Sequence, residues 1–353
     1  MDPATDTPGS REGSSRSTTG ATTDGLDRDA LSTPIARKAD LVRESLAALD
    51  GAVIAFSGGV DSSVVAALAH DALGDDAVAC TAKSETLPAA ELDDAVRVAE
   101  EIGIRHEVVE FSELADPAFV ANDGDRCYHC RTMRLGRMYE TAAEMGIETV
   151  CDGTNASDPG EGHRPGLRAV EELSVRSPLL THDIDKSEVR KIADAYGLSV
   201  ADKPSMACLS SRIPTGLEVT EERLTRVERA ERVLRDRGFS QFRVRDHDGL
   251  ARIEVAPEEL ADALDPEFAD AVADRLREIG FDHVTLDLEG YRTGSVSPDE
   301  DGADDGADAD DEGGADDGTD GSADRDDERD ETESDETAQQ ALDIGREYPR
   351  AGR

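Results

Sequence analysis

Several residue types are scarce in this chain of 353 residues. It has no Trp, 3% aromatic residues and five Cys, and only five of its 38 basic residues are Lys. No run of 18 or more apolar residues occurs, which excludes a membrane-spanning helix of ordinary composition. The first residues contain no apolar segment, so we expect no secretory signal peptide and a soluble, cytoplasmic protein.

The cysteines are too few, in a long chain without an export signal, to predict a disulfide framework. Cys127 and Cys130 form a C-x-x-C pair, a spacing used by zinc sites, redox pairs and iron–sulfur clusters alike. Cys208 stands between Lys203 and Arg212, whose positive charges favour a thiolate. The alternative for Cys208 is a buried structural thiol, which its polar neighbours argue against.

Acidic residues dominate the charge, and the formal net charge is −43. Residues 299–337 contain 21 acidic and 2 basic side chains, but the rest of the chain is strongly acidic too. High acid content with few Lys and few aromatic residues resembles proteins of a high-salt cytoplasm, where carboxylates keep the surface hydrated. Such acidity ordinarily argues against a nucleic-acid partner, although multimolar salt weakens that argument.

A phosphate-binding segment begins at residue 53. The β-branched run 53–56 is typical of a buried strand, and apolar residues recur at helical spacing from residue 61 onward. Between them lies Ser57-Gly58-Gly59-Val60-Asp61-Ser62-Ser63. Its glycines permit a tight turn, and free N–H groups and the helix dipole point at one place. The segment lacks the Lys of a Walker A loop. We therefore predict an anion site here, the alternative being a glycine turn without a ligand.

Strands and helices alternate along residues 36–196. Strands are expected at 53–56, 77–82, 106–111 and 149–151, and helices at 36–49, from 61 onward, and at 92–102, 131–145 and 186–196. This alternation predicts an α/β fold with a doubly wound parallel sheet, Rossmann-like, whose ligand lies at the carboxyl ends of the strands.

A smaller α/β region follows the first. A charged helix is expected at 221–237, a hairpin at 241–246 and 251–255, helices at 257–264 and 266–279, and a strand at 283–288. We predict four parts: a disordered tail at 1–33, a larger domain at 34–213, a C-terminal domain at 214–296 that binds substrate, and an acidic low-complexity tail at 297–353.

The loop at 57–63 resembles the PP-loop of ATP pyrophosphatases, which cut ATP between its α- and β-phosphates and leave an adenylated substrate. Three further segments resemble LarE-type sulfur transferases, and the resemblance covers about residues 36–292. They are D-G-T-N at 152–155, R-P-G-L-R-A at 164–169 and K-P-S-M-A-C-L-S-S-R-I-P at 203–214. The resemblance implies ATP and Mg²⁺ as cofactors. It implies conversion of a carboxylate of pyridinium-3,5-biscarboxylate mononucleotide to a thiocarboxylate, in the biosynthesis of a nickel-pincer cofactor.

The same resemblance implies the roles of the cysteines. Cys208 is the catalytic residue, and in the single-cysteine branch of the family it gives up its own sulfur and becomes dehydroalanine. In the three-cysteine branch Cys127, Cys130 and Cys208 hold a [4Fe–4S] cluster with one iron free to carry an extra sulfide. We favour the cluster, and zinc bound by the three cysteines is the further alternative.

The remaining site residues are carried over from the family by position. The resemblance implies that Arg243 and Arg245 bind the substrate phosphate; residues two apart on a strand share a face, and paired guanidiniums suit phosphate. The alternative is a pair of exposed strand arginines. The resemblance also implies that Glu231, Glu254 and Asp262 bind metal ions, the alternative for Glu254 and Asp262 being ordinary surface acids. The residues expected to bind ATP are Ser57, Gly58, Gly59, Val60, Asp61, Ser62, Ser63, Lys83, Ser84, Gly153, Thr154 and Asn155.

Three other functions compete with sulfur transfer to a nucleotide. A tRNA-thiolating PP-loop enzyme would need a basic RNA-binding surface, of which only the Arg-rich segment 223–237 gives a sign. An amidating enzyme such as an NAD synthetase would not need Cys208. A non-catalytic metal-binding protein would release no pyrophosphate. The expected partners are a sulfide donor, cofactor-assembly proteins and further copies of the chain, and a membrane is not expected.

Overall fold

The computed structural model describes residues 25–158, 165–204 and 207–292. Its centre is a parallel sheet in the order β3-β2-β1-β4. The strands are β1 (Ala52–Ala55), β2 (Ala77–Lys83), β3 (Arg105–Glu110) and β4 (Val150–Cys151). Alternate side chains of β1 point to opposite faces, so Ile54 enters one core and Val53 the other. The predicted doubly wound α/β fold is confirmed.

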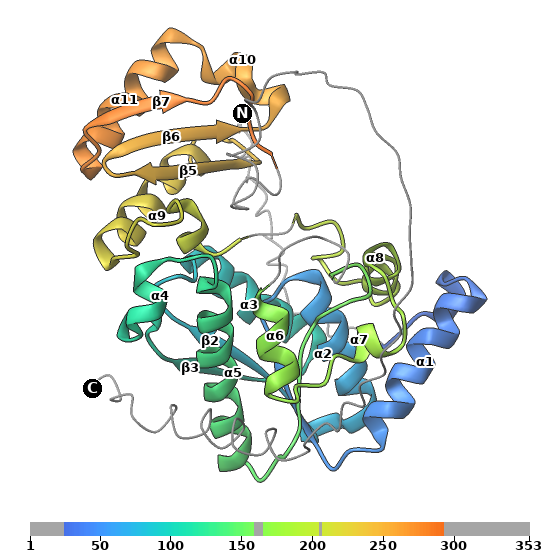
Figure 1. Ribbon diagram of the computed structural model, residues 1–353. Helices are drawn as coiled ribbons and strands as arrows, with labels where there is room; N and C mark the ends of the chain where they lie inside the picture. The colour runs from blue at the N-terminus through green and yellow to red at the C-terminus, as the bar shows by residue number, and fades with distance from the viewer. Residues whose placement is uncertain (1–24, 159–164, 205–206, 293–353) are drawn as a thin grey trace, which may run out of the picture.

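Helices cover both faces of the parallel sheet (Figure 1). On one face lie α1 (Thr33–Ala47), α2 (Val60–Leu73), α3 (Ala89–Ile102) and α8 (Lys186–Ala195). On the other face lie α5 (Arg126–Glu144) and α6 (Pro165–Glu172). Two buried thiols are part of these cores, Cys80 on β2 and Cys151 on β4, each fully covered. The core on each face is made largely of Val, Ile, Leu and Ala, as the apolar strand sequences predict.

A second, mixed sheet has the order β5-β6-β7. Strands β5 (Phe242–His247) and β6 (Leu250–Val255) form the predicted hairpin, and β7 (His283–Leu286) pairs parallel to β6. The hairpin turn is Asp248-Gly249, and both residues have positive φ, at 54° and 92°. Such a two-residue turn matches the twist of the flanking strands. The sheet packs against α9 (Glu221–Arg235) and α11 (Pro266–Ile279).

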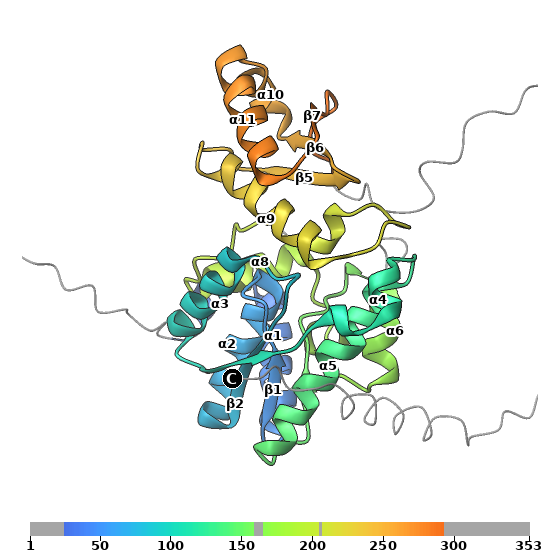
Figure 2. The ribbon, with the colours of Figure 1, turned by 90° about the vertical axis from the view of Figure 1, so that its left-hand side faces the viewer.

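Helix α9 lies between the two sheets (Figure 2). In its first half, Leu224 and Val227 pack in a cluster with Phe119, Leu209 and Ile213. These last three residues precede the predicted boundary at 213/214. Its second half packs into the core of the mixed sheet through Ala230, Val233 and Leu234. The predicted boundary therefore falls inside a region whose two sides share a core.

Several element boundaries differ from the prediction. Helix α5 begins at Arg126 and not at residue 131, because its first turn faces a cavity and so lacks the apolar periodicity of a core-facing helix. Short helices at Pro117–Ala121 (α4) and Pro178–Thr181 (α7) were not predicted, and both start with a Pro at the first helical position. The predicted helix at 257–264 is a 3₁₀ turn, Pro257–Glu259, followed by α10 (Leu260–Ala263).

The predicted N-terminal tail is too long. Residues 25–33 pack against the protein: Leu26 and Leu31 contact the core, and the Asp27 N–H donates to the Ala195 carbonyl at 3.0 Å. Two leucines in a polar stretch provide enough apolar surface to dock it. The predicted acidic tail lies outside the described residues from 293 onward. No helix within the described ranges has the length and apolarity needed to cross a membrane.

Candidate active site

The loop between β1 and α2 has the geometry of a phosphate-binding turn. Gly58 has a φ of 69°, and a Cβ there would lie 2.6 Å from the Cα of Ala95, so only Gly fits. Gly59 is the N-cap of the 14-residue helix α2 and no side chain caps its N–H groups. The Ser57 N–H donates to the Ser62 Oγ at 3.2 Å, which closes the loop. Free amides and the helix dipole thus face outward together.

A second loop, after β4, meets the first at the carboxyl edge of the sheet. A Cβ on Gly153 would lie 2.8 Å from the Ser62 nitrogen, so the two loops touch. Asn155 Nδ2 donates to Asp61 Oδ1 at 3.1 Å. Lys186, the first residue of α8, places Nζ 2.5 Å from Asp61 Oδ2. The aspartate of the phosphate loop is therefore held by an amide and an ammonium from two other segments.

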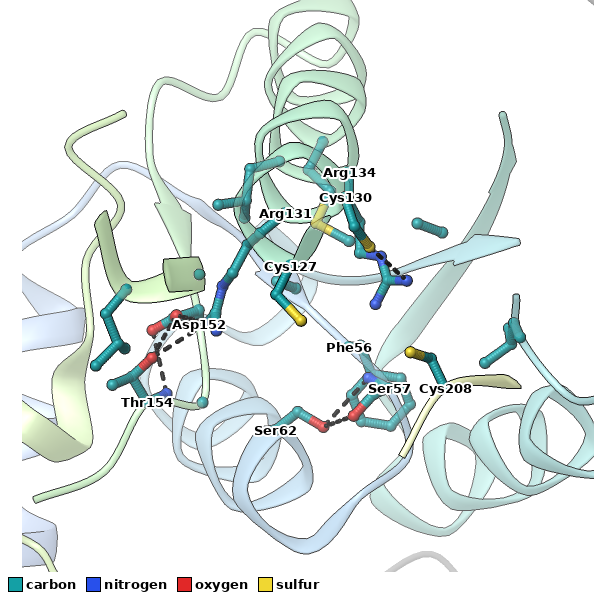
Figure 3. A pocket seen from close by; sticks show the side chains of 18 of the residues that line it. Phe56, Ser57, Ser62, Cys127, Cys130, Arg131, Arg134, Asp152, Thr154 and Cys208 are labelled. Carbon is teal, nitrogen blue, oxygen red and sulfur yellow. Dashed lines mark hydrogen bonds and ion pairs between the residues drawn. The ribbon is translucent and has the colours of Figure 1, made fainter. Parts of the chain in front are cut away.

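A cavity of about 500 Å³ opens beside these loops. The phosphate loop forms one wall through Ser57, Asp61 and Ser62, and the loop after β4 contributes Asp152, Gly153 and Thr154. Cys127 and Cys130, in the first turns of α5, and Cys208, just before the 3₁₀ turn Leu209–Arg212 (η5), line the same cavity. Figure 3 shows Cys127 and Cys208 projecting from opposite sides into the space over the loop. The cysteines and the phosphate loop thus share one site.

Three arginines of α5 also line the cavity, and none of them is among the site residues predicted from the sequence. Arg126, Arg131 and Arg134 recur at helical spacing with the two cysteines, in the pattern R-C-x-x-C-R-x-x-R, so all five share one face. Arg131 is paired with Asp152 and donates to Thr154 Oγ1 at 3.2 Å (Figure 3). The spacing was the signal that could have identified this positive wall, which suits a substrate with several negative groups.

Glu113 is a second residue that the sequence did not indicate. It is fully buried next to the cavity wall, and its Oε1 accepts from Thr86 Oγ1 at 3.0 Å and Arg134 Nη2 at 3.3 Å. The Cys130 thiol donates to the same oxygen at 3.4 Å. Burial raises the pKa of the Cys130 thiol above its ordinary value, against the opposing effect of Arg134. Burial therefore favours the protonated form of the Cys130 thiol.

Other predicted site residues lie away from the cavity wall. Lys83 pairs with Glu110 at 2.7 Å on the exposed side of β2 and β3, and Ser84 Oγ lies 3.2 Å from Thr86 Oγ1. Neither lines the cavity. Asp262 is exposed on α10.

Arg243, Arg245, Glu231 and Glu254 are buried in the mixed sheet and α9. Glu231 pairs with Arg212 at 2.7 Å, and Glu254 pairs with Arg245 at 2.5 Å. None of the four lines the cavity.

Whether the expected metals fit this structure depends on how the side chains of the predicted ligands are placed. Among the described residues no group of three or more His, Cys, Asp or Glu is placed to hold a metal ion. The three cavity thiols have the donor chemistry of an iron–sulfur cluster but are not assembled as its ligands. Glu231 and Glu254 are each satisfied by an arginine, and Asp262 is not brought to them. The structure therefore does not provide a ready metal site at either place.

A glycine loop that opens a helix at the carboxyl edge of a parallel sheet, without a Walker lysine, places this protein among the α/β proteins that bind phosphate groups at that edge. The model of the NAD synthase family matches residues 35–124, which contain this loop. The chain is 37% identical over 268 residues to pyridinium-3,5-bisthiocarboxylic acid mononucleotide synthase of Lactiplantibacillus plantarum, covering 76% of this chain and 96% of that protein. The chain belongs to the PP-loop ATP pyrophosphatase family related to LarE.

The chain is also similar to two further relatives. An uncharacterized protein of Synechocystis sp. is 44% identical over 260 residues, covering 74% of this chain and 97% of the relative. The tRNA-specific 2-thiouridylase MnmA of Maricaulis maris is 33% identical over 188 residues, covering 43% of this chain and 46% of the relative. The similarity to the thiouridylase is thus limited to about half of each chain.

Proposed function

We propose that this protein is an ATP-dependent sulfur transferase that converts a carboxylate of pyridinium-3,5-biscarboxylate mononucleotide to a thiocarboxylate. The observation that carries the proposal is the single cavity that joins the phosphate loop to Cys127, Cys130 and Cys208. A plain ATP-binding or amidating enzyme has no need of three thiols facing its phosphate loop. The relative from L. plantarum, whose name is that of a bisthiocarboxylic acid mononucleotide synthase, supports the choice of substrate.

The residues fit the first half of such a reaction. A carboxylate oxygen attacks the α-phosphorus of ATP, the bond to the β-phosphate breaks, and an acyl adenylate and pyrophosphate form. The amides of the phosphate loop, and the ammonium of Lys186 that pairs with Asp61 of that loop, are the donors that we expect to stabilise the negative charge of the leaving pyrophosphate. Mg²⁺, when bound with ATP, supplies further charge neutralisation. Arg131 and Arg134 provide positive groups for the carboxylates or phosphate of the substrate.

The second half of the reaction needs a sulfur nucleophile. The Cys208 sulfur, after loss of its proton, attacks the acyl carbon, AMP leaves and a thioester forms. Loss of the Cys208 Cα proton and cleavage of its Cβ–S bond then give the thiocarboxylate and dehydroalanine. The competing proposal is a [4Fe–4S] cluster on the three cysteines, which would supply sulfide when bound and leave Cys208 intact. The cavity brings the three thiols to one space, and iron and sulfide content decides between the two.

The test is an anaerobic incubation with ATP, Mg²⁺ and the dicarboxylated nucleotide, followed by mass spectrometry of the small molecule and the intact protein. Multimolar KCl is included, because we propose from the acid-rich composition that the protein works at high salt. A thiocarboxylate with dehydroalanine at position 208 identifies a single-use donor. A thiocarboxylate with intact Cys208 and bound iron identifies the cluster. Release of pyrophosphate without any thiolated nucleotide contradicts the proposal.

Thiolation of tRNA is the second candidate, since the similarity to MnmA favours it. The outer side of α9 and its C-terminal end expose Arg229, Arg232, Arg235 and Arg237, and acidic residues on the same segment reduce their field. Incubation with unmodified tRNA in place of the nucleotide tests this candidate. A thiolated base, with no thiolated nucleotide in the parallel reaction, would replace the first proposal.

A further inference from the structure

Arg212 and Glu231 form a buried ion pair between η5 and α9. Their exposed fractions are 1% and 2%, and Arg212 is among the largest fully buried side chains of the described residues. Arg212 Nε donates to Glu231 Oε1 at 2.7 Å and Nη2 donates to Oε2 at 3.3 Å. Removing two charges from water is costly, so a pair of this kind adds little stability over apolar residues of similar size. We therefore consider which local geometry the ion pair fixes.

The remaining N–H groups of Arg212 hold the segment that carries Cys208. Arg212 Nη1 donates to the carbonyl of Ala207 at 2.9 Å and to the carbonyl of Cys208 at 3.4 Å. It also donates to Ser211 Oγ at 3.0 Å, and that hydroxyl donates to the Cys208 carbonyl at 2.7 Å. One guanidinium therefore fixes the backbone on both sides of the cysteine.

A residue of the mixed sheet forms a hydrogen bond to the same segment at a second point. Arg245 on β5 donates from Nη1 to the Ser211 carbonyl at 3.1 Å, while its Nε pairs with Glu254 on β6 at 2.5 Å. Glu231 is itself fixed to β5, because its Oε1 accepts from the Val244 N–H at 3.2 Å. Each acid thus orients an arginine whose other N–H groups hold residues 207–211.

The opposite side of the segment is bonded to the loop between β2 and α3 and packs against α4. The Leu209 N–H donates to the Thr86 carbonyl at 2.9 Å, and Leu209 is buried with Phe119 and Ile213. Burial alone would lower the pKa of Arg212, but the carboxylate of Glu231 raises it above its ordinary value. The guanidinium therefore remains a charged donor, bonded to Glu231 on α9.

We propose that Arg212 and Glu231 are positioning residues that hold Cys208 against the phosphate loop, with Arg245 and Glu254 as a second anchor. The proposal rests on the proposed role of Cys208 in sulfur transfer. It assigns the two buried glutamates to arginines and not to metal ions. It also gives the mixed sheet a part in the chemistry, because that sheet determines where the Cys208 sulfur lies.

The test variant is Arg212→Met combined with Glu231→Gln, which removes the donors to the carbonyls without leaving an unpaired buried charge. The matched control is Arg226→Met with Asp246→Asn, a pair at 2.5 Å with a buried acid, on the same helix and sheet, that does not contact residues 207–211. The first measurement is hydrogen–deuterium exchange of the segment 207–213 in the full chain. The second compares pyrophosphate release with thiocarboxylate formation.

We expect faster exchange at 207–213 and unchanged exchange in β1 and β2 for the test variant. Thiocarboxylate formation should fall about 100-fold while pyrophosphate release stays within about twofold, the size expected when a reacting group moves by about 1 Å. The control should match the wild type in all three measurements. Unchanged sulfur transfer, or an equal loss of both activities, overturns the proposal.

Failure of the proposed function is distinguishable from failure of this inference. If the wild-type chain thiolates no nucleotide, the proposed function is wrong, and the exchange measurement alone decides the positioning role. Exchange at 207–213 that is the same in the test variant and the control would then overturn it. Faster exchange confined to that segment in the test variant would support it.

Discussion

The ammonium of Lys186 lies 2.5 Å from the carboxylate of Asp61, so the first residue of α8 holds the acid of the phosphate loop. The two residues are separated by 125 positions and meet only because α8 packs beside α2. Lys is rare in this chain, and here it pairs a compact charge with the aspartate of the phosphate loop. The pair links the nucleotide-binding turn to a helix that the sequence had not connected with the site.

Replacement of Lys186 by Ala should impair adenylation. We expect pyrophosphate release to fall about 100-fold, the effect of removing one charged donor from a developing anion. The measurement is the rate of the first turnover of pyrophosphate release at saturating ATP and nucleotide substrate. Lys191→Ala, an exposed lysine on the same helix, is the control and should keep the wild-type rate. Equal rates for the two variants would contradict a role for Lys186.

A side chain at position 58 should destabilise the protein. Gly58→Ala forces a positive φ on Ala and brings its Cβ against the Ala95 backbone, so we expect the free energy of unfolding to fall by about 2 kcal/mol. Gly136→Ala is the control, because Gly136 lies within α5 and a Cβ there meets nothing within 4 Å. Better helix propensity should raise the free energy by about 0.5–1 kcal/mol. Urea titration measures both, and a neutral Gly58→Ala would refute the tight turn.

The cysteine variants separate the two sulfur sources. Cys208→Ala should abolish thiocarboxylate formation in either case and leave ATP binding intact. Cys127→Ala should abolish it only if a cluster is the source, with loss of bound iron and sulfide. The measurements are product mass, iron content and ATP affinity by calorimetry. Cys80→Ala, a core thiol that does not line the cavity, is the control. Thiolation retained in Cys208→Ala would remove Cys208 from the mechanism.

Stability should depend on the protonation of His106. The Thr81 hydroxyl donates its hydrogen to the Phe56 carbonyl, so its oxygen accepts a hydrogen bond from His106 Nε2 at 2.8 Å. Burial lowers the pKa of His106, although Glu107 opposes the shift. The unfolded chain therefore takes up a proton first as the pH falls. The contribution of His106 to the free energy of unfolding is fully present above about pH 6.5 and is lost as the pH falls from there towards the folded pKa.

Urea midpoints between pH 5 and 8 at fixed salt measure this effect. His106→Gln should flatten the decline on the acidic side, because the titrating group is gone. His283→Gln changes an exposed histidine on β7 and should leave the profile unchanged. If His106→Gln and the wild type decline in parallel, His106 does not account for the dependence.

Local patterns in the sequence predicted most of the fold. In the segment 53–63, β-branched residues predict the strand, glycines the turn and apolar periodicity the helix. Each of these signals depends only on residues that are close together in the sequence. The start of α5 was missed because Arg126, Cys127 and Cys130 face a cavity and the first turn carries no apolar pattern. Whether a helix face borders a cavity depends on the segments packed opposite it, and the apolar periodicity of the helix itself contains no information about them.

The partners of buried ion pairs were the other feature that the sequence did not predict. Glu231 and Glu254 were two acids among 81, and nothing local distinguishes a metal ligand from the partner of a buried arginine. Arg212 lies 19 residues from Glu231, a separation that only the packing of η5 on α9 brings within hydrogen-bonding distance. The choice between the two roles depends on tertiary geometry, and so does the site built around Cys208.

Helix α9 has a consequence for how the protein unfolds. Its two halves belong to two hydrophobic cores, one with Phe119 and Leu209 and the other with the mixed sheet. Loss of either core would expose half of a continuous helix and remove apolar contacts from the surviving core. The two cores are thus thermodynamically coupled through α9, and we expect them to unfold in one cooperative transition.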